Sequence, residues 1–120
     1  MYESIFVAQV ELNPGVRGED LEKFWVEEFL PNATELPGWT PTLHRGDHGR
    51  RTGQYLLVCY FASVERARQL FPGTKDAVGR NEISEEFNQW AAANPTWGEA
   101  MSYLDYGKMM GESTEYAQIK

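Results

Sequence analysis

Apolar and polar residues alternate along the first stretch of the chain, over residues 2–12, as they do in β-strands. Phe6 and Ala8 share one face of this predicted strand, while Ile5 and Val7 lie on the other. A sheet that leaves one side in solvent keeps that side polar. Apolar residues on both faces therefore indicate that both faces are covered.

The middle of the chain predicts a β-hairpin. A Pro-Gly turn leads into a strand over residues 39–45, a charged loop with three glycines spans 46–53, and a strongly apolar strand returns over 54–62. The weak alternation of the second strand is typical of a central strand that is buried on both faces.

The register of this hairpin decides which polar side chain shares a face with the apolar residues. Pairing that is symmetric about the loop places His44 opposite Tyr55, on the same face as Leu57, and directs Arg45 to the other face. A slip of one residue would exchange His44 and Arg45.

Helical spacing of apolar residues predicts three helices, over residues 18–30, 63–71 and 82–93. Ser63 is the expected N-cap of the second helix, since its hydroxyl can accept a hydrogen bond from the first turn. Residues 74–80 are predicted as a loop between the second and third helices.

A last strand is predicted over residues 101–110, and a loose polar tail over 111–120. The resulting order βαββαβ, with antiparallel pairing, is that of the ferredoxin-like topology. We therefore expect one α+β domain over residues 1–110, with a four-stranded antiparallel sheet. The helix over 82–93 is an extra element before the last strand.

Composition narrows the possible partners. The chain has 120 residues and a formal net charge of −7, which argues against nucleic acid and anionic membranes because both attract positively charged surfaces. The single cysteine, Cys59, cannot form an intrachain disulfide, and its apolar strand suggests that it packs as a small hydrophobic residue. The first residues lack the pattern of a signal peptide, so we expect a cytoplasmic protein.

Three motifs carry a resemblance to known proteins. They are Leu36-Pro-Gly-Trp39 after the first helix, the strand from Tyr55 that leads through Ser63 into the second helix, and Tyr103-Leu-Asp-Tyr106. In these motifs the chain resembles the dimeric α/β-barrel superfamily, which includes cofactor-free antibiotic-biosynthesis monooxygenases, Dabb-type proteins, EthD-like proteins and haem-degrading monooxygenases. The resemblance implies a homodimer whose two sheets pack face to face, with one pocket per subunit between sheet and helices.

The chain departs from two groups within that superfamily. Haem-degrading members carry an iron-ligating histidine on the later helical segment, but residues 63–94 contain no histidine. Dabb-type cyclases carry histidines early in the first strand and after the second helix. Here Ser4 lies in the first of these regions and neither contains a histidine, so the roles of the cyclase residues do not transfer.

Glu28 is the most conspicuous polar residue on an otherwise apolar helix face. Its position falls within the arc of Phe24 and Trp25, and Asn32 joins this arc if the helix continues past residue 31. In a pocket wall, desolvation would raise the pKa of Glu28 and let it exchange protons near neutral pH, while Asn32 would orient a carbonyl or phenolate. The alternative is that Glu28 reaches solvent at the end of the helix.

His44 is the second candidate for proton transfer, because it is the only histidine within a predicted strand and its ordinary pKa lies near neutrality. The alternative is a partly exposed histidine on an edge strand. Arg45 and the loop arginines could attract a carboxylate or phenolate substrate, although such loops are often simply solvated. We expect no metal site, because His44 and His48 diverge on a strand and a loop.

Large aromatic residues could line a cavity that accepts an aromatic ligand. The alternative is that these residues only fill the core, as aromatic residues at helical spacing usually do. The candidates are Trp25, Phe29, Tyr55 and Trp90.

We therefore expect a small-molecule enzyme, either a cofactor-independent monooxygenase or a cyclase or isomerase, acting on an aromatic or polyketide-like substrate. The alternatives are a non-catalytic homodimer that binds a hydrophobic metabolite or haem, and a stress-linked structural dimer with a filled core.

Overall fold

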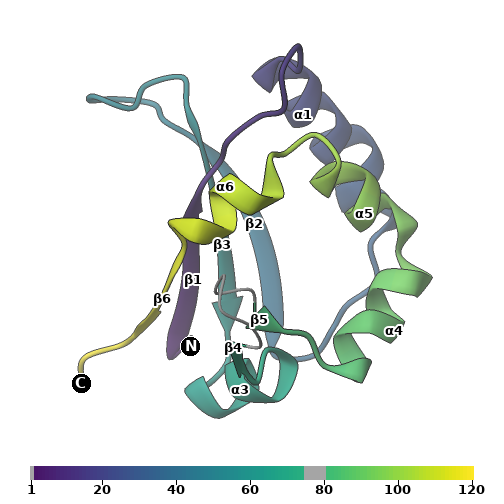
Figure 1. Ribbon diagram of the computed structural model, residues 1–120, viewed down its shortest axis with the longest axis vertical. Coiled ribbons are helices and arrows are strands. Elements are labelled where there is room, and N and C mark those ends of the chain that lie inside the picture. Colours follow the sequence, from purple (N-terminus) through teal and green to yellow (C-terminus); the bar gives the residue numbers. More distant parts are fainter. Residues whose placement is uncertain (1, 75–80) are drawn as a thin grey trace.

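The computed structural model describes residues 2–74 and 81–120. Four strands form one open antiparallel sheet in the order β2-β3-β1-β6 (Figure 1). Each strand pairs antiparallel with its neighbour, and β1 lies between β3 and β6. This is the strand order of the ferredoxin-like fold, so the predicted fold class is confirmed. The strands are β1 (Ser4–Gln9), β2 (Trp39–Arg45), β3 (Tyr55–Phe61) and β6 (Thr114–Ala117).

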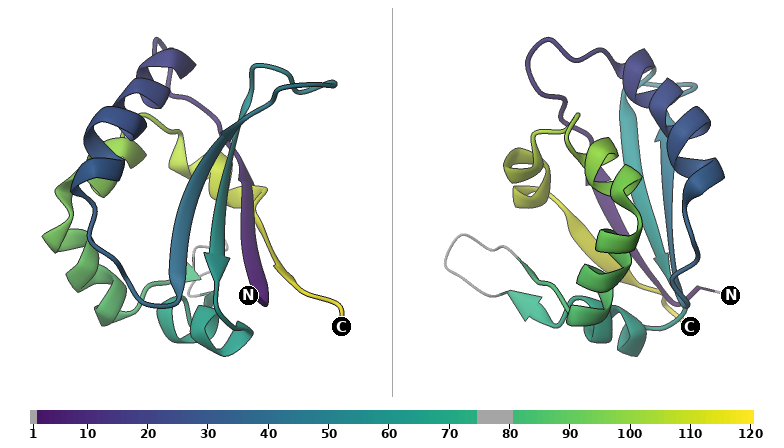
Figure 2. Two further views of the ribbon diagram at one scale, coloured as in Figure 1. Left: turned by 180° about the vertical axis from the view of Figure 1, so that it is seen from behind. Right: turned by 90° about the vertical axis from the view of Figure 1, so that its right-hand side faces the viewer.

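Helices cover one face of this sheet, which we call the inner face (Figures 1 and 2). The first helix is continuous through α1 (Gly18–Phe24), the π-helical turn η1 (Trp25–Phe29) and α2 (Leu30–Asn32), so it extends past residue 31. The later helices are α3 (Val64–Leu70), α4 (Glu85–Ala93), α5 (Pro95–Met101) and α6 (Tyr106–Gly111). The predicted helices over 18–30, 63–71 and 82–93 are confirmed, with ends that differ by a few residues.

Between α3 and α4, two short strands, β4 (Gly73–Thr74) and β5 (Asn81–Glu82), pair with each other. Most of the loop predicted over 74–80 lies outside the described residues.

The last strand is not where the sequence predicted it. Residues 101–110 end α5 and form most of α6, and the final strand is Thr114–Ala117, inside the segment predicted as a loose tail. The prediction failed because the aromatic and methionine side chains of 101–110 are as apolar as those of a buried strand. They instead cover the sheet from a helix, where Met109 is almost fully buried.

The predicted hairpin register is wrong by one residue. Arg45 pairs with Tyr55 and His44 pairs with Leu56. Beyond Arg45, Gly46 donates to the Gln54 carbonyl at 2.7 Å, which leaves an odd number of residues, 47–53, in the loop. The predicted pairing assumed an even number of loop residues. It therefore gave each residue of β2 a partner one position away from its real partner in β3.

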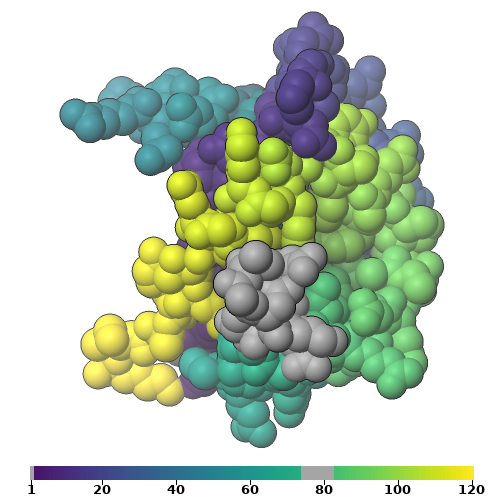
Figure 3. Space-filling model, in the orientation of Figure 1, coloured from purple at the N-terminus to yellow at the C-terminus, as the bar shows by residue number. Residues whose placement is uncertain are grey.

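The opposite, outer face of the sheet has no helix over it among the described residues (Figure 2). Its central side chains are apolar, which agrees with the apolar positions predicted on both faces of the first strand. The tip of the β2–β3 hairpin extends away from the body of the molecule (Figure 3). The outer face carries Ile5, Val7, Gln9, Thr40, Thr42, His44, Leu56, Val58, Tyr60, Thr114 and Tyr116.

None of the helices in the described part of the chain combines the length and apolar character needed to cross a bilayer.

Candidate functional site

A cavity of about 390 Å³ lies between the inner face of the sheet and helices α4, α5 and α6. This volume falls within the range of small-molecule sites, roughly 300–1,000 Å³. The walls are predominantly apolar, with aromatic rings from the sheet and the helices and three methionine side chains from the end of the chain. The main contributors are Trp39, Phe61, Phe87, Trp97, Met101 and Met109.

Trp39 reaches the cavity because a tight turn ends at it. Pro37 and Gly38 occupy the centre of this turn, in which the Trp39 amide donates to the Leu36 carbonyl at 3.2 Å. Gly38 has a φ of +79°, a value that glycine adopts at little steric cost. Trp39 therefore begins β2 opposite Phe61, with its side chain on the inner face.

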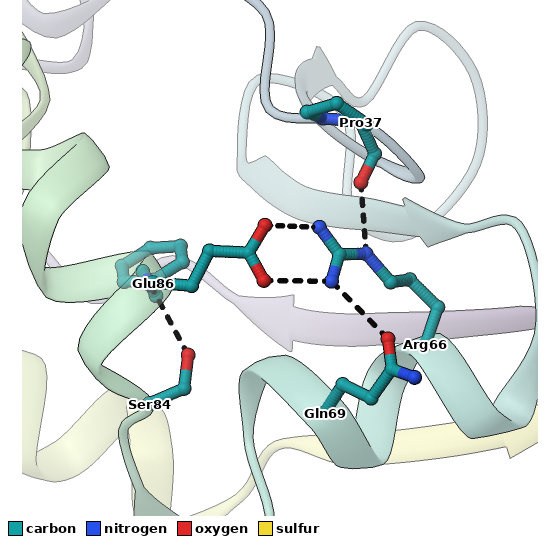
Figure 4. A network of polar contacts seen from close by, with 6 residues as sticks. Pro37, Arg66, Gln69, Ser84 and Glu86 are labelled. Carbon is teal, nitrogen blue, oxygen red and sulfur yellow. Dashed lines mark hydrogen bonds and ion pairs between the residues drawn. The ribbon is translucent and has the colours of Figure 1, made fainter.

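Arg66 of α3 fixes this turn to the helical layer (Figure 4). Its Nε donates to the Pro37 carbonyl at 2.9 Å, and two guanidinium nitrogens pair with the Glu86 carboxylate at 2.6 and 2.8 Å. The Arg66 side chain is only 17% exposed, so solvent screens this bidentate pair less than it screens a surface ion pair. Arg66 thus joins the turn before Trp39 to α4, which carries Phe87 and Trp90.

Three aromatic rings pack against the Trp39 ring, and we call them the aromatic cluster. Phe87, Trp90 and Trp97 lie 5.1, 5.0 and 5.2 Å from it between ring centroids, all in edge-to-face arrangements. Such pairs stabilise packing beyond simple area burial. The three rings also contact one another, so they form one continuous support for the indole.

Few polar groups line the cavity. The Cys59 thiol is buried, and this burial raises its pKa to about 12, so it stays protonated and weakly nucleophilic. Burial also raises the pKa of the Tyr106 hydroxyl, with a smaller contribution from Cys59. Glu115 brings a carboxylate to the wall and forms an ion pair with Arg68. Within the described residues, no group of three or more His, Cys, Asp or Glu side chains could hold a metal ion.

A second, more polar groove of about 330 Å³ lies near the base of the hairpin and includes Trp25 and His44 in its lining. Its polar groups satisfy one another, since Tyr55 donates to Glu22 at 2.7 Å and Arg45 forms an ion pair with the same carboxylate. The Tyr55 hydrogen bond lowers the pKa of Glu22, and Arg45 adds to this effect. The pKa of Tyr55 is raised, mainly by burial and secondly by its hydrogen bond to Glu22. Because these groups are already paired, the groove is a weaker candidate than the cavity.

The structure separates the residues that the sequence singled out. Glu28 is exposed, and its backbone carbonyl accepts a hydrogen bond from the Asn32 side chain at 2.7 Å, away from the cavity. His44 lies on the outer face, because the register differs from the predicted one. Neither proton-transfer candidate therefore lines the cavity.

The aromatic candidates are all buried. Trp25 and Phe29 pack against each other with ring centroids 4.4 Å apart, and Tyr55 is held by Glu22. Trp90 donates its indole N–H to the Thr34 carbonyl at 2.8 Å and belongs to the aromatic cluster. Trp25, Phe29 and Trp90 all pack against Trp97, which lines the cavity, but none of the three belongs to the lining itself. Trp25, Tyr55 and Arg45 line the polar groove.

The sequence reasoning did not assign Trp39, Cys59, Tyr106 or Met109 to a site. The alternation of apolar residues in β3 would have placed Cys59 and Phe61 on one face, and Trp39 follows once the register is correct. No signal in the sequence distinguished the helix containing Tyr106 and Met109 from a strand.

Comparison with known proteins does not assign the chain to a family. No family model and no curated protein sequence matches the chain. Among solved structures, a protein of Bordetella bronchiseptica is similar over the whole of both chains, with 18% sequence identity and a TM-score of 0.49. The assignment of that protein as an antibiotic biosynthesis monooxygenase is itself a proposal.

Proposed function

We propose that the protein binds a flat, largely apolar molecule, aromatic or polyketide-like, in the cavity between the sheet and the helices. This proposal rests on the cavity, whose lining consists almost entirely of aromatic, aliphatic and methionine side chains. Such walls favour an apolar ring system because its transfer from water is favourable and the rings offer flat packing partners.

We further propose that the bound molecule is a substrate for cofactor-independent oxygenation. In this reaction an electron-rich phenol or enol gives up its proton, and the resulting anion reduces O₂. One oxygen atom enters the substrate and the other leaves as water, with all electrons supplied by the substrate. An apolar cavity suits this chemistry because it keeps water away from the reactive anion. The motifs shared with the dimeric α/β-barrel superfamily support the same proposal.

Glu115 is the proposed proton acceptor, because it is the carboxylate that lines the cavity among the described residues. Its ion pair with Arg68 holds the carboxylate at the wall. An apolar cavity that keeps water from the anion suits its reaction with O₂, so we propose monooxygenation rather than cyclisation or isomerisation.

Binding without turnover is the second candidate. The pairing of Glu115 with Arg68 favours it, because the guanidinium already occupies the carboxylate that would take the proton. Haem fits this candidate less well than a metabolite does. His44 lies on the outer face and His48 in the exposed hairpin loop, so neither histidine lines the cavity as an axial ligand.

A cavity-filling variant tests the proposal. Gly98 lines the cavity from α5, and a Cβ added there meets no atom within 4 Å, so Gly98→Leu should plug the cavity while the helix persists. Gly107→Leu, in α6 and outside the cavity lining, is the matched control. We expect the wild type and Gly107→Leu to bind 1,4-dihydroxynaphthalene, detected by quenching of tryptophan fluorescence, and Gly98→Leu to lose binding at least tenfold.

Oxygen uptake with the same compound separates the two candidates. Monooxygenation predicts that wild-type protein raises O₂ consumption above spontaneous oxidation, and that Glu115→Gln reduces the increase at unchanged affinity. Binding with no added O₂ consumption would support the non-catalytic candidate. Equal binding by wild type and Gly98→Leu would contradict the proposed site.

We also propose a homodimer that pairs two outer faces. The outer face has an apolar centre at Ile5, Val7 and Val58, is free of helices in the described part of one chain, and lies opposite the cavity. Pairing two copies would bury this surface and leave each cavity accessible.

A further inference from the structure

One polar group in the cavity wall has no partner. The indole Nε1 of Trp39 is buried and makes no hydrogen bond within the described part of the chain, and the residue is 4% exposed. Buried N–H groups are almost always paired, since leaving one unpaired is costly. An unpaired buried donor in a cavity wall therefore suggests that a bound molecule supplies the acceptor.

Cys59 does not fill this role. Its sulfur lies close enough for the Trp39 indole to influence the thiol, but the two groups do not reach hydrogen-bond geometry. Sulfur is also a weak acceptor. An oxygen atom placed in the cavity beside Cys59 would be the stronger partner for the indole N–H.

The direction of the donor is fixed before any ligand arrives. The aromatic cluster packs against the Trp39 ring in three edge-to-face contacts, and Arg66 holds the turn that precedes it. A donor that is already oriented, in surroundings of low polarity, stabilises a partial or full negative charge more strongly than a mobile donor in water does.

Trp90, a member of the aromatic cluster, supports this assignment by contrast. Trp90 is also buried, but its Nε1 donates to the Thr34 carbonyl at 2.8 Å, so its N–H is already satisfied. The indole N–H of Trp39, a residue of the cavity wall, has no such partner within the described part of the chain.

We propose that Trp39 is the specificity-determining residue of the cavity, and that its indole N–H binds an oxygen acceptor conjugated to the ligand's ring system. The matching chemistry is a ketone, quinone or phenolate oxygen on an otherwise apolar ring. This inference rests on the proposed function, because it concerns the molecule that occupies the same cavity.

Two ligands of nearly equal shape test the inference. The ketone 1-tetralone carries a ring-conjugated carbonyl, and tetralin lacks it. Titration of tryptophan fluorescence should show that Trp39→Phe weakens 1-tetralone binding about five- to tenfold more than tetralin binding, the effect of one lost hydrogen bond. Trp90→Phe, which removes an already satisfied N–H, should change both affinities by the same factor.

A second measurement needs no variant at position 39. In ¹⁵N-labelled wild-type protein, the indole N–H resonance of Trp39 should move downfield on addition of 1-tetralone, and move much less with tetralin. The Trp90 resonance should respond similarly to both compounds.

The possible outcomes distinguish the two proposals. If both compounds bind, but Trp39→Phe weakens them equally or the Trp39 resonance responds equally to both, the role of Trp39 is wrong while the binding cavity stands. If neither compound binds wild-type protein, the proposed binding function fails, and the inference fails with it.

Discussion

At the scale of single residues, the buried Cys59 thiol makes the free energy of unfolding decrease as the pH becomes alkaline. Burial raises its pKa from 9.0 to about 12, so above pH 9 the unfolded chain loses the thiol proton while the folded chain keeps it. The folded state is then disfavoured as pH rises through the window from 9 to 12. We expect the free energy of unfolding to fall by about 1.4 kcal/mol between pH 8 and pH 10 from this group.

Urea denaturation at pH 8, 9 and 10 measures this loss, and Cys59→Ala provides the control. The variant has no thiol to ionise, so its stability should fall less over this range. Identical slopes for the two proteins would show that Cys59 titrates normally in the folded state.

Tyr55 and Glu22 allow a second prediction at this scale. The Tyr55 hydroxyl donates to Glu22 and is the main cause of the lowered pKa of that carboxyl. Tyr55→Phe should therefore raise the Glu22 pKa toward its ordinary value, measured by ¹³C NMR titration of the carboxyl. The stabilisation from this bond is present above the ordinary glutamate pKa and is lost as pH falls through the lower folded value. Tyr60→Phe, on the outer face, should leave the Glu22 midpoint unchanged.

At the scale of the elements, Asn94 joins the helical layer to the chain before β2. Its side chain, 2% exposed, accepts from the Thr34 amide at 2.8 Å and donates to the Trp90 carbonyl at 2.8 Å. Asn94→Ala would leave buried partners unsatisfied, so we expect a loss of about 2 kcal/mol in the free energy of unfolding. Gln89→Ala, at an exposed position of α4, should stay within about 0.5 kcal/mol of wild type. A loss for Asn94→Ala as small as that of the control would contradict the structural role of Asn94.

Some of these elements can be predicted from the sequence and others cannot. The hairpin strands and the helix capped by Ser63 were predictable, because turn residues and an N-cap mark their ends locally; the Ser63 side chain does accept from the Arg66 amide at 2.9 Å. The strand β6 was not, because Thr114–Ala117 is mostly exposed and polar at the edge of the sheet. Its pairing with β1 is a long-range property that local periodicity does not record.

The candidate site was less predictable than the helices and hairpin strands, because it also depends on long-range pairing. One residue of register moved His44 from the inner to the outer face, and the odd loop that causes the shift leaves no clear mark in the composition of 46–53. The unpaired indole of Trp39 becomes visible only when its neighbours from β3, α4 and α5 are in place.

At the scale of the whole molecule, the proposed dimer makes the outer face an interface. Val7 lies at its centre, between Val58 and Thr114 on the neighbouring strands. Val7→Lys should place a charge within the interface and convert the dimer to a monomer in light scattering coupled to size exclusion. Val26→Lys is the matched control, because Val26 is 57% exposed on the helical side. A monomeric wild-type protein, or a Val7→Lys variant that remains dimeric, would contradict this pairing.

The proposed ligand binds in the cavity between the sheet and the helices. The most direct measurement is a set of intermolecular NOEs between 1-tetralone and the ε-methyl groups of Met101 and Met109, which line the cavity from α5 and α6. We predict NOEs to both methyl groups in wild-type protein and their loss in Gly98→Leu. NOEs that involve only the methyl groups of Val7 and Val58 on the outer face would contradict the account.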